Sequence, residues 1–193
     1  MTLLIRPLST EEMVIPLDWA RQEGWNPGLS DGPCFYHVDP NGFLGAFLNG
    51  QPVATISAVR YGDAFGFMGF YIVSPEHRGK GYGLQLWHAA LKHLDGLPSI
   101  GLDGVVAQQD NYRKSGFIYT HRNGRFKGVT PFPSSQKTLE SKEQVDPAKD
   151  LDFDALCAFD AVHFPTRRAD FLRCWMSRPG HRALVIHNSH RVV

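Results

Sequence analysis

The chain has 193 residues, of which 42% are hydrophobic and 20% are charged, as expected for a globular protein of one domain or slightly more. Twenty basic and nineteen acidic side chains give a formal net charge of +1, which argues against a sequence-wide attraction to nucleic acid or to an anionic membrane. No long apolar run and no signal-peptide pattern occurs, so we expect a cytoplasmic protein without a membrane span.

Cysteine and histidine usage argues against both a disulfide framework and a metal site. The three cysteines are odd in number and far apart along the chain: Cys34, Cys157 and Cys174. None has a Cys-x-x-Cys partner, and disulfide-rich proteins use closely spaced pairs. The histidines near the end of the chain follow no zinc-binding pattern: His181, His187 and His190. We therefore expect scattered histidines and no metal.

The first forty residues predict a strand, a helix and a long loop. Residues 3–8 favour a strand, and Ser9 with Glu12 three residues later is typical of a helix start. The helix should run to about residue 22, with a kink or a break at Pro16. Residues 24–42 are rich in Gly, Pro, Asn and Asp, and predict a loop around a short strand or turn at 34–38.

The next segments predict a sheet. Residues 43–48 and 52–61 flank Asn49-Gly50, a strong hairpin signal. Residues 65–73 carry no charge and predict a strand buried on both faces. A helix from 84 to 94, with Leu84, Trp87, Leu91 and Leu94 on one face, then leads to a parallel strand at 99–106 through a right-handed crossover.

Three glycines on alternate positions separate the buried strand from this helix. They are Gly79, Gly81 and Gly83, and Arg78 and Lys80 stand among them. A glycine turn that opens a helix can bind an anion through unpaired backbone amides, so we interpret it as a phosphate or pyrophosphate cradle. The alternative is a tight turn without a ligand. The string matches neither a P-loop nor a dinucleotide-binding loop.

This stretch resembles the acyl-coenzyme A loop of the GCN5-related N-acetyltransferase (GNAT) family. The matching pattern is Arg-x-x-Gly-x-Gly at 78–83, preceded by Val73-x-Pro75. The resemblance implies an α/β fold with a GNAT-like mixed central sheet flanked by helices, and acetyl-CoA as co-substrate. It implies that the loop amides hold the pyrophosphate and that the strand before them offers its backbone to the pantetheine arm. The binding residues expected are Ile72, Val73, Arg78, Gly79, Lys80, Gly81, Tyr82 and Gly83.

A second match lies at 112–117, which reads Tyr-x-Lys-x-Gly-Phe as in many members of the family. We expect a short helix here, ended by Gly116. The family tyrosine lies near the thioester sulfur, which makes Tyr112 the candidate general acid; the alternative is a tyrosine that packs the helix on the sheet. The chain departs from the family at Val105, where many members have asparagine. Beyond this helix, 117–120 and 125–129 flank a turn at Asn123-Gly124.

The acceptor side is less specified. In the family, the loop at 24–42 helps to wall the acceptor pocket, which makes Trp25, Phe35 and Tyr36 candidates for lining residues, with core packing as the alternative. Many members use a glutamate on the central strand as the base, and this strand has none. Three residues or a water chain remain open as the base: Asp63, Glu76 and Tyr71.

The remainder of the chain predicts a linker and a second, partial α/β module. Residues 130–148 are rich in proline, serine and charge. Helices follow at 152–163, capped by Asp152, and at 166–176, capped by Thr166, and strands at 182–187 and 191–193. This order repeats the first module and resembles bacterial tandem GNAT proteins. We expect a GNAT domain at 1–130, a linker at 131–148 and the first part of a second module at 149–193, cut off within its third strand.

The function expected is transfer of an acetyl group from acetyl-CoA to a primary amine. Balanced charge and an aromatic-rich loop favour a small-molecule amine, with a peptide amine as the alternative acceptor. We expect no nucleic-acid or membrane partner, and a homodimer is a candidate assembly. The rival hypothesis is a non-catalytic acyl-CoA sensor or a tandem-domain scaffold, favoured by the missing strand glutamate and by Val105.

Overall fold

The computed structural model describes residues 2–28, 30–124, 126, 128–129, 144–188 and 191–192. Its N-terminal part is built on a five-stranded sheet in the order β1-β2-β3-β4-β5. The strands are β1 (Leu3–Pro7), β2 (Phe43–Leu48), β3 (Gln51–Tyr61), β4 (Phe65–Val73) and β5 (Ile100–Leu102). The first four are antiparallel neighbours, and β5 joins β4 in parallel. The predicted mixed sheet and the parallel crossover are confirmed.

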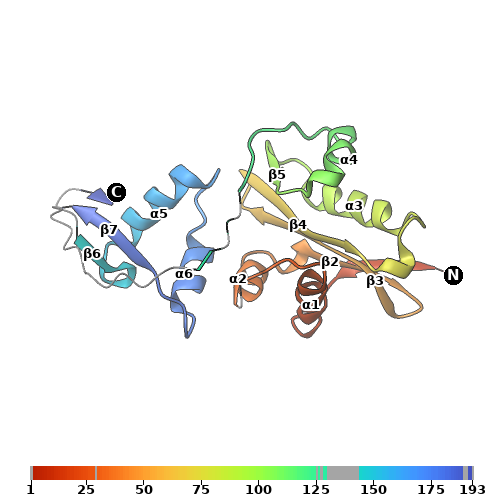
Figure 1. Cartoon of the computed structure of the whole chain (residues 1–193), viewed down its shortest axis with the longest axis horizontal. Helices are drawn as coiled ribbons and strands as arrows, with labels where there is room; N and C mark the ends of the chain where they lie inside the picture. Colours follow the sequence, from red (N-terminus) through yellow and green to blue (C-terminus); the bar gives the residue numbers. More distant parts are fainter. Residues whose placement is uncertain are drawn as a thin grey trace.

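Helices cover both faces of this sheet (Figure 1). On one face lie α1 (Val14–Gln22) and α2 (Asp31–Val38), and on the other lie α3 (Tyr82–His93) and α4 (Gln109–Lys114). Short 3-10 turns adjoin them at Glu11–Met13, Pro40–Gly42, Pro75–His77 and Val106–Gln108. Each face has its own apolar cluster, one packed under α3 and the other containing aromatic side chains of α2. Both clusters bury apolar surface, and the free energy gained by removing that surface from water is the main stabilisation of such layers.

The start of the first helix follows the predicted pattern. The Ser9 amide donates to Glu12 Oε2 at 2.9 Å, and the Glu12 amide donates back to Ser9 Oγ at 3.4 Å. Arg6 pairs with the same carboxylate at 2.6 Å and lowers the pKa of Glu12 to about 2. Of the predicted alternatives, a kink or two pieces, the structure has two pieces, since a 3-10 turn at Glu11–Met13 precedes α1 from Val14. The junction lies before Pro16, and a proline in the first helical turn removes no intrahelical hydrogen bond.

The predicted loop with a strand or turn at 34–38 is also wrong, because α2 occupies Asp31–Val38. Its sequence is a poor helix former, with Gly32 and Pro33 in the first turn. Packing overrides this preference: Cys34 is fully buried, and Phe35 stacks on Phe171 with ring centroids 4.4 Å apart. Tertiary contacts made far along the chain are not visible in a local pattern.

The hairpin and the crossover helix match their predictions with one exception. Asn49 and Gly50 both have positive φ, at 52° and 81°, as a two-residue hairpin turn requires. The buried face of α3 includes Leu86, Trp87 and Ala90. Leu84, predicted on that face, is 58% exposed and lies instead on the wall of a cavity described below.

Strand β4 contains a bulge at its centre. Thr55 and Ser57 of β3 pair with Ile72 and Gly69, so a single β3 residue faces two residues of β4. Within the bulge Phe70 has φ 47°, a conformation that costs a non-glycine residue on the order of 1–3 kcal/mol. The Thr55 hydroxyl donates to the Phe70 carbonyl oxygen at 3.1 Å. This buried hydrogen bond ties the strained residue to its neighbour strand.

The C-terminal part forms a second, smaller sheet in the order β6-β7-β8. Its elements are β6 (Gln144–Pro147), a 3-10 turn (Ala148–Asp150), α5 (Phe153–His163), α6 (Ala169–Ser177), β7 (Leu184–Asn188) and β8 (Arg191–Val192). Asp152 caps α5 as predicted, by accepting from two backbone amides. The predicted cap at Thr166 is wrong, since α6 begins after Arg168. The predicted linker at 131–148 is too long, because β6 lies inside it.

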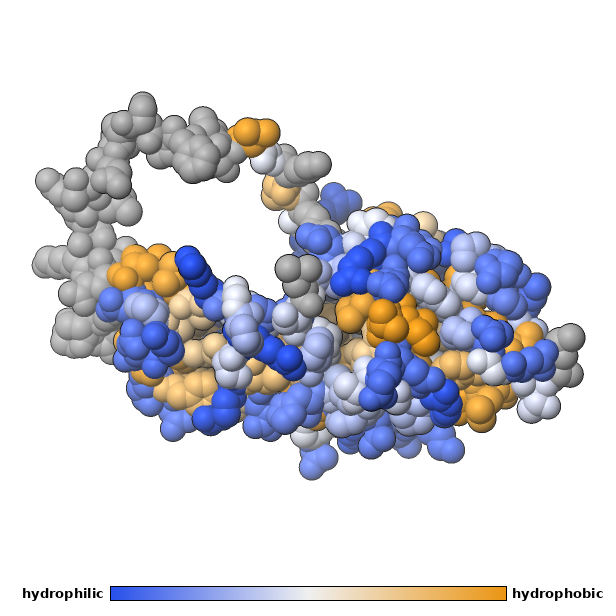
Figure 2. Space-filling model, turned by 90° about the horizontal axis from the view of Figure 1, so that it is seen from below, coloured by the Kyte–Doolittle hydropathy of each residue, from blue (hydrophilic) through white to orange (hydrophobic). Residues whose placement is uncertain are grey.

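The element order of this part repeats that of the first. In each, a strand is followed by a 3-10 turn, two helices and an antiparallel hairpin, and the first strand pairs with the first strand of the hairpin. The two parts therefore share this order of elements, and the second GNAT-like module stays a prediction. One face of the second sheet leaves apolar residues exposed, with Leu184 at 68% and Val145 at 58%, and Figure 2 shows apolar patches scattered over the lower face of the molecule.

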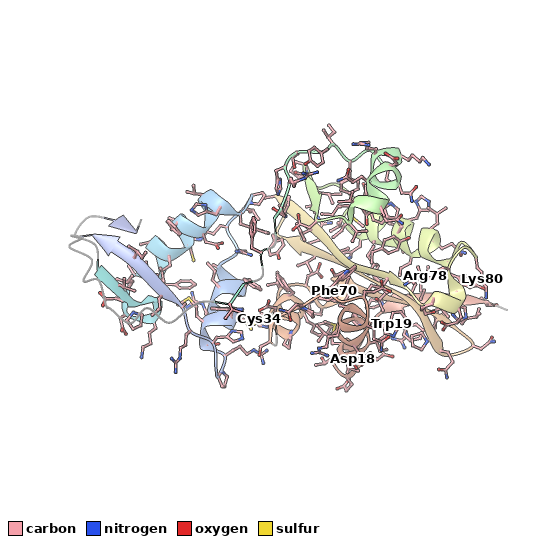
Figure 3. All side chains as sticks on the ribbon, viewed as in Figure 1. Asp18, Trp19, Cys34, Phe70, Arg78 and Lys80 are labelled. Atoms are coloured by element: carbon pink, nitrogen blue, oxygen red, sulfur yellow. The ribbon has the colours of Figure 1, made fainter. Side chains whose placement is uncertain are left out.

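Aromatic contacts join the two parts. Phe164, between α5 and α6, packs against Tyr61 and Phe65 with ring centroids 5.0 and 5.5 Å away. Trp175 of α6 donates from Nε1 to Asp31 at 2.8 Å. Cys34 lies at the same boundary (Figure 3); burial, together with a contact to Cys174, raises the pKa of its thiol to about 11. The C-terminal part therefore docks on α2 within one chain.

The segments on either side of the predicted turn at Asn123-Gly124 form no strand in the described residues. Residues 117–124, 126 and 128–129 have no strand assignment, and Ile118 is 85% exposed. Arg125 and Lys127 lie outside the described residues. The edge of β5 consequently has no strand beside it in the part of the chain that the structure describes.

The bulge provides a first prediction. Thr55→Val keeps the shape of the side chain but removes the donor to the Phe70 carbonyl, and we expect the free energy of unfolding to fall by about 1–3 kcal/mol, the usual cost of a buried polar group left without its partner. Urea denaturation measures it. Thr120→Val is the control, because Thr120 is exposed and its hydroxyl contacts only the adjacent His121; it should change stability by less than about 0.5 kcal/mol. Equal stabilities of the two variants would contradict the prediction.

Candidate active site

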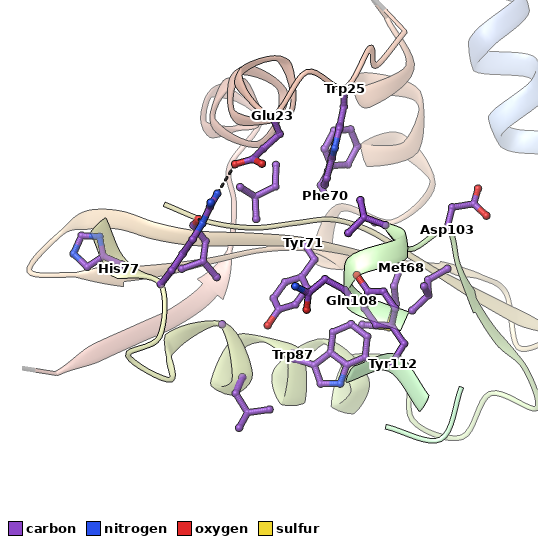
Figure 4. Close-up of a pocket in the computed structure, with 18 of the residues that line it drawn as sticks. Glu23, Trp25, Met68, Phe70, Tyr71, His77, Trp87, Asp103, Gln108 and Tyr112 are labelled. Atoms are coloured by element: carbon purple, nitrogen blue, oxygen red, sulfur yellow. Dashed lines mark hydrogen bonds and ion pairs between the residues drawn. The ribbon is translucent and has the colours of Figure 1, made fainter. Parts of the chain in front are cut away.

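A cavity of about 500 Å³ opens where β4 and β5 separate. The two strands pair over only three residues each, and the last pair is Met68 with Leu102. Beyond it, from Gly69 to Val73, the backbone of β4 has no strand on that side, and this stretch lines the cavity (Figure 4). An extended ligand can use such an edge as an added strand would.

One end of the cavity is formed by the glycine loop and the start of α3. Gly79 and Gly81 have φ 74° and 80°, and a Cβ at either position would meet nothing within 4 Å, so the space above the loop is open. Gly83 differs, because a Cβ there would lie 2.7 Å from both Tyr71 Oη and Val73 Cγ2. The loop therefore presents the unpaired amides of a helix N-terminus to the cavity, an arrangement that favours anions.

The Arg78 side chain spans this end rather than standing free. Its Nε donates to the Val73 carbonyl oxygen at 2.9 Å, and its guanidinium pairs with Glu23 at the end of α1 (Figure 4). Both partners are accessible, so the pair itself contributes little to stability. Its effect is geometric, since it joins the loop to the opposite wall of the cavity.

Most of the predicted CoA-binding residues lie together in this cavity. The lining includes Ile72, Val73, Arg78, Gly79, Gly81 and Gly83, and excludes Lys80 and Tyr82. Lys80 is exposed at the outer side of the loop (Figure 3). Tyr82 packs against the core under α3 and lies near the His77 ring, at 6.0 Å between centroids. The spacing of glycines thus predicted the loop but could not tell which side chains face inward.

Tyr112 lines the same cavity, and so does Tyr71. The Tyr112 ring lies 5.7 Å from the Trp87 ring and so close to Gly104 that a Cβ on Gly104 would meet its Cε2 at 2.2 Å. Burial raises the pKa of Tyr112. Burial also raises the pKa of Tyr71, with a smaller contribution from Tyr112. Both phenols are therefore protonated at neutral pH and can donate hydrogen bonds into the cavity.

Some of the remaining predicted site residues line the cavity and others lie outside it. Trp25 lines the cavity as expected, whereas Phe35 and Tyr36 pack in the core on the α2 face. Neither Asp63 nor Glu76 belongs to the lining, and Asp63 is fully exposed in the turn before β4. Four polar residues of the lining escaped the sequence analysis: Glu23, His77, Asp103 and Gln108. Of these four, only Asp103 could have been identified from the sequence, because it directly follows a strand parallel to β4.

Comparison with known proteins agrees with this geometry. Residues 10–117 match the model of the acetyltransferase (GNAT) family, a range that runs from the first helix to the end of α4 and includes the glycine loop. The chain belongs to the GNAT family. The resemblance predicted from the loop and from the Tyr112 segment is confirmed.

Two curated relatives match a large share of the chain. Holothin acyltransferase of Pseudoalteromonas sp. is 35% identical over 188 residues, which cover 97% of this chain and 62% of that protein. An uncharacterized protein of Caenorhabditis elegans, F36G3.2, is 28% identical over 131 residues, which cover 66% of this chain and 42% of that protein. The chain therefore spans less than two thirds of the length of either relative.

Solved structures show the same GNAT fold. An acetyltransferase from Pyrococcus horikoshii matches with a TM-score of 0.68 at 16% identity, over 98% of this chain and 69% of that chain. Ard1 from Thermoplasma volcanium matches with a TM-score of 0.55 at 18% identity, over 63% of this chain and 86% of that chain. The match to the Pyrococcus horikoshii structure extends through the C-terminal part of this chain. The match to Ard1 covers a length that corresponds to one GNAT domain.

The described residues contain no candidate for a membrane-spanning helix or for a metal site. No helix there is long and apolar enough to cross a membrane. Within the same residues, His, Cys, Asp and Glu side chains form no group of three or more that could hold a metal ion.

The open loop gives a second prediction. Gly81→Glu places a carboxylate where the loop faces the cavity, and two unit charges 4 Å apart at an effective dielectric constant of 20 repel by about 4 kcal/mol. We expect the Kd for CoA to rise on the order of 1000-fold, measured by isothermal titration. Gly96→Glu is the matched control, because Gly96 also has positive φ and open space around it but lies beyond the other end of α3. An unchanged Kd in Gly81→Glu would remove the loop from the binding site.

Proposed function

We propose that this protein is an N-acetyltransferase that moves an acetyl group from acetyl-CoA to a primary amine. The observation that carries the proposal is the edge of β4 from Gly69 to Val73, beside which no strand of the described residues lies on the side of the cavity. This edge leads directly into a glycine loop at a helix N-terminus. Such an edge suits the two amides of the pantetheine arm. The loop amides suit the pyrophosphate of the same molecule. The 35% identity to an acyltransferase over nearly the whole chain supports the same reaction class.

The reaction requires little beyond positioning and proton transfer. The amine nitrogen attacks the thioester carbonyl carbon, a carbon–nitrogen bond forms, and the carbon–sulfur bond breaks when the tetrahedral intermediate collapses. Holding both reactants in one cavity supplies the entropic advantage. We assign the hydrogen-bond donors for the developing oxyanion to the backbone amides at the bulge, around Phe70 and Tyr71, which line the cavity. The leaving sulfur takes a proton, and the Tyr112 phenol is our proposed donor.

The acceptor we propose is a small primary amine. Trp25 lines the cavity on the side of α1, and apolar or aromatic wall residues suit a compact organic amine. The near-neutral chain offers no broad acidic surface for a basic peptide.

A panel assay tests the proposal against the rival acyl-CoA sensor. CoA release is measured with acetyl-CoA and a set of primary amines, alongside acetyl-CoA binding by calorimetry. An N-acetyltransferase releases CoA only when a suitable amine is present and forms the amide, which mass spectrometry identifies. Tight acetyl-CoA binding with no turnover on any amine would support the sensor and reject the transferase.

The role of Tyr112 gives a third prediction. Tyr112→Phe keeps the ring on Trp87 and removes only the hydroxyl, so kcat should fall on the order of 100- to 10,000-fold while the Kd for acetyl-CoA changes little. Burial raises the pKa of Tyr112 above its usual value of about 10, so ionisation of this phenol should not reduce the wild-type kcat between pH 7 and 9. Saturation kinetics with an accepted amine measure both effects. A wild-type kcat in the variant would make Tyr112 a packing residue.

For the domain organisation, we propose a GNAT domain at 1–130 and a second GNAT-like module in the C-terminal part. The repeated element order of that part supports the second module, and β6 moves its start from residue 149 to about residue 144. The module repeats the element order of the first part, in which the segment after the first helix lines the cavity. A homodimer remains a proposal that size-exclusion chromatography with light scattering can test.

A further inference from the structure

The reaction cavity carries opposite charge at its two ends. Arg78 and the N-terminus of α3 lie at one end, and Asp103, which directly follows β5, lies at the other (Figure 4). The second carboxylate of the lining, Glu23, is already paired with Arg78. Asp103 forms no ion pair with the residues that the structure describes, and its Oδ1 accepts a hydrogen bond from Asn123 Nδ2 at 2.9 Å. Asp103 is thus an exposed, oriented anion at the cavity wall, and no cation of the described residues pairs with it.

The strand register places Asp103 at the level where β4 and β5 separate. Met68 pairs with Leu102, so the next residues along the two parallel strands are Gly69 and Asp103, at the level where the strands separate and the bulge begins. The residue after Asp103 is Gly104, which contacts the Tyr112 ring through its bare Cα. Asp103 therefore lies at the edge of β4 where β5 ends, and its neighbour in the chain, Gly104, contacts the proposed acid.

We propose that Asp103 binds the ammonium group of the acceptor and takes up the proton that the nitrogen loses before it attacks. The inference rests on the proposed N-acetyltransferase function and supplies its missing base. An oxygen–hydrogen bond forms on Asp103 as a nitrogen–hydrogen bond breaks, and the neutral amine then forms the bond to the thioester carbon. On collapse the sulfur leaves with the proton of Tyr112, and the second proton that the nitrogen loses as the amide forms passes through water to the Tyr112 phenolate. Asp103 then releases its proton to solvent, so the first deprotonation of the amine and the protonation of the sulfur use different side chains of one cavity.

The lining also defines the class of acceptor. Trp25 and Phe70 belong to the same cavity as Asp103 and supply aromatic rather than charged surface. Among the described residues, the cavity has one carboxylate free for a cation, which fits a substrate with one ammonium group and an apolar or aromatic body. A polyamine or a basic peptide would leave its further cations unpaired, which is costly when they are desolvated.

The test compares Asp103→Ser with Asp110→Ser. Asp110 is an exposed aspartate of α4 that pairs with Arg113 and lies outside the cavity lining. The first measurement is kcat/KM with acetyl-CoA and benzylamine, or another accepted aryl-alkyl amine, at pH 7 and at a pH above the pKa of the free amine. The second is the Kd for acetyl-CoA. The third is the Kd of benzylamine for the CoA-saturated protein at pH 7.

We expect Asp103→Ser to lower kcat/KM at pH 7 by about 100-fold or more. The deficit should shrink at high pH, where the amine arrives already neutral, and the Kd for acetyl-CoA should stay within about twofold, which also shows that the variant folds. Benzylamine binding should weaken at least tenfold in Asp103→Ser and persist in Asp110→Ser.

Several outcomes overturn the inference. They are a kcat/KM for Asp103→Ser within twofold of wild type, a loss of the same size at both pH values, and equal benzylamine affinity in both variants. If the wild-type protein acetylates no amine, the proposed function fails by itself; equal benzylamine binding by wild type and Asp103→Ser would then also reject Asp103 as the ammonium site.

Discussion

The bulge in β4 is the constraint on which the rest of the site depends. Phe70, at φ 47°, turns the strand away from its parallel neighbour after only three paired residues. The separation leaves backbone groups of β4 unpaired, which is tolerable because they face a cavity rather than a packed core. Strain of this kind persists where the surroundings hold it, here through the hydrogen bond from the buried Thr55 hydroxyl.

The cavity that results has walls from three separate elements. The loop before α3 closes the end suited to an anion, α1 and the residues after it contribute Glu23 and Trp25, and the region after β5 contributes Asp103 and Tyr112. The pair between Arg78 and Glu23 bridges the first two walls. In the function that we propose, donor and acceptor enter from opposite ends of the cavity and meet beside the bulge.

The sequence predicted what depends on local chemistry. Asn49-Gly50 specified a hairpin, the alternate glycines specified the turn into α3, and the uncharged strand at 65–73 specified the centre of the sheet. It failed where distant contacts decide: α2 forms because Cys34 and Phe35 pack against α6 and neighbouring layers. Gly69 before Phe70 was a readable sign of a bulge, but its consequence, an open strand edge, requires knowledge of where β5 stops. Likewise no spacing rule places Glu23 across from Arg78, 55 residues away.

The docking of the C-terminal part on α2 has a consequence for how the molecule loses its structure. Phe164 packs against the apolar cluster that contains Tyr61 and Phe65 of the first sheet, so part of that core is completed by a side chain from beyond residue 143. Two regions that share a core melt together rather than in sequence. Heating should therefore produce one calorimetric transition, and the first sheet owes part of its thermal resistance to Phe164, a residue outside the cavity lining.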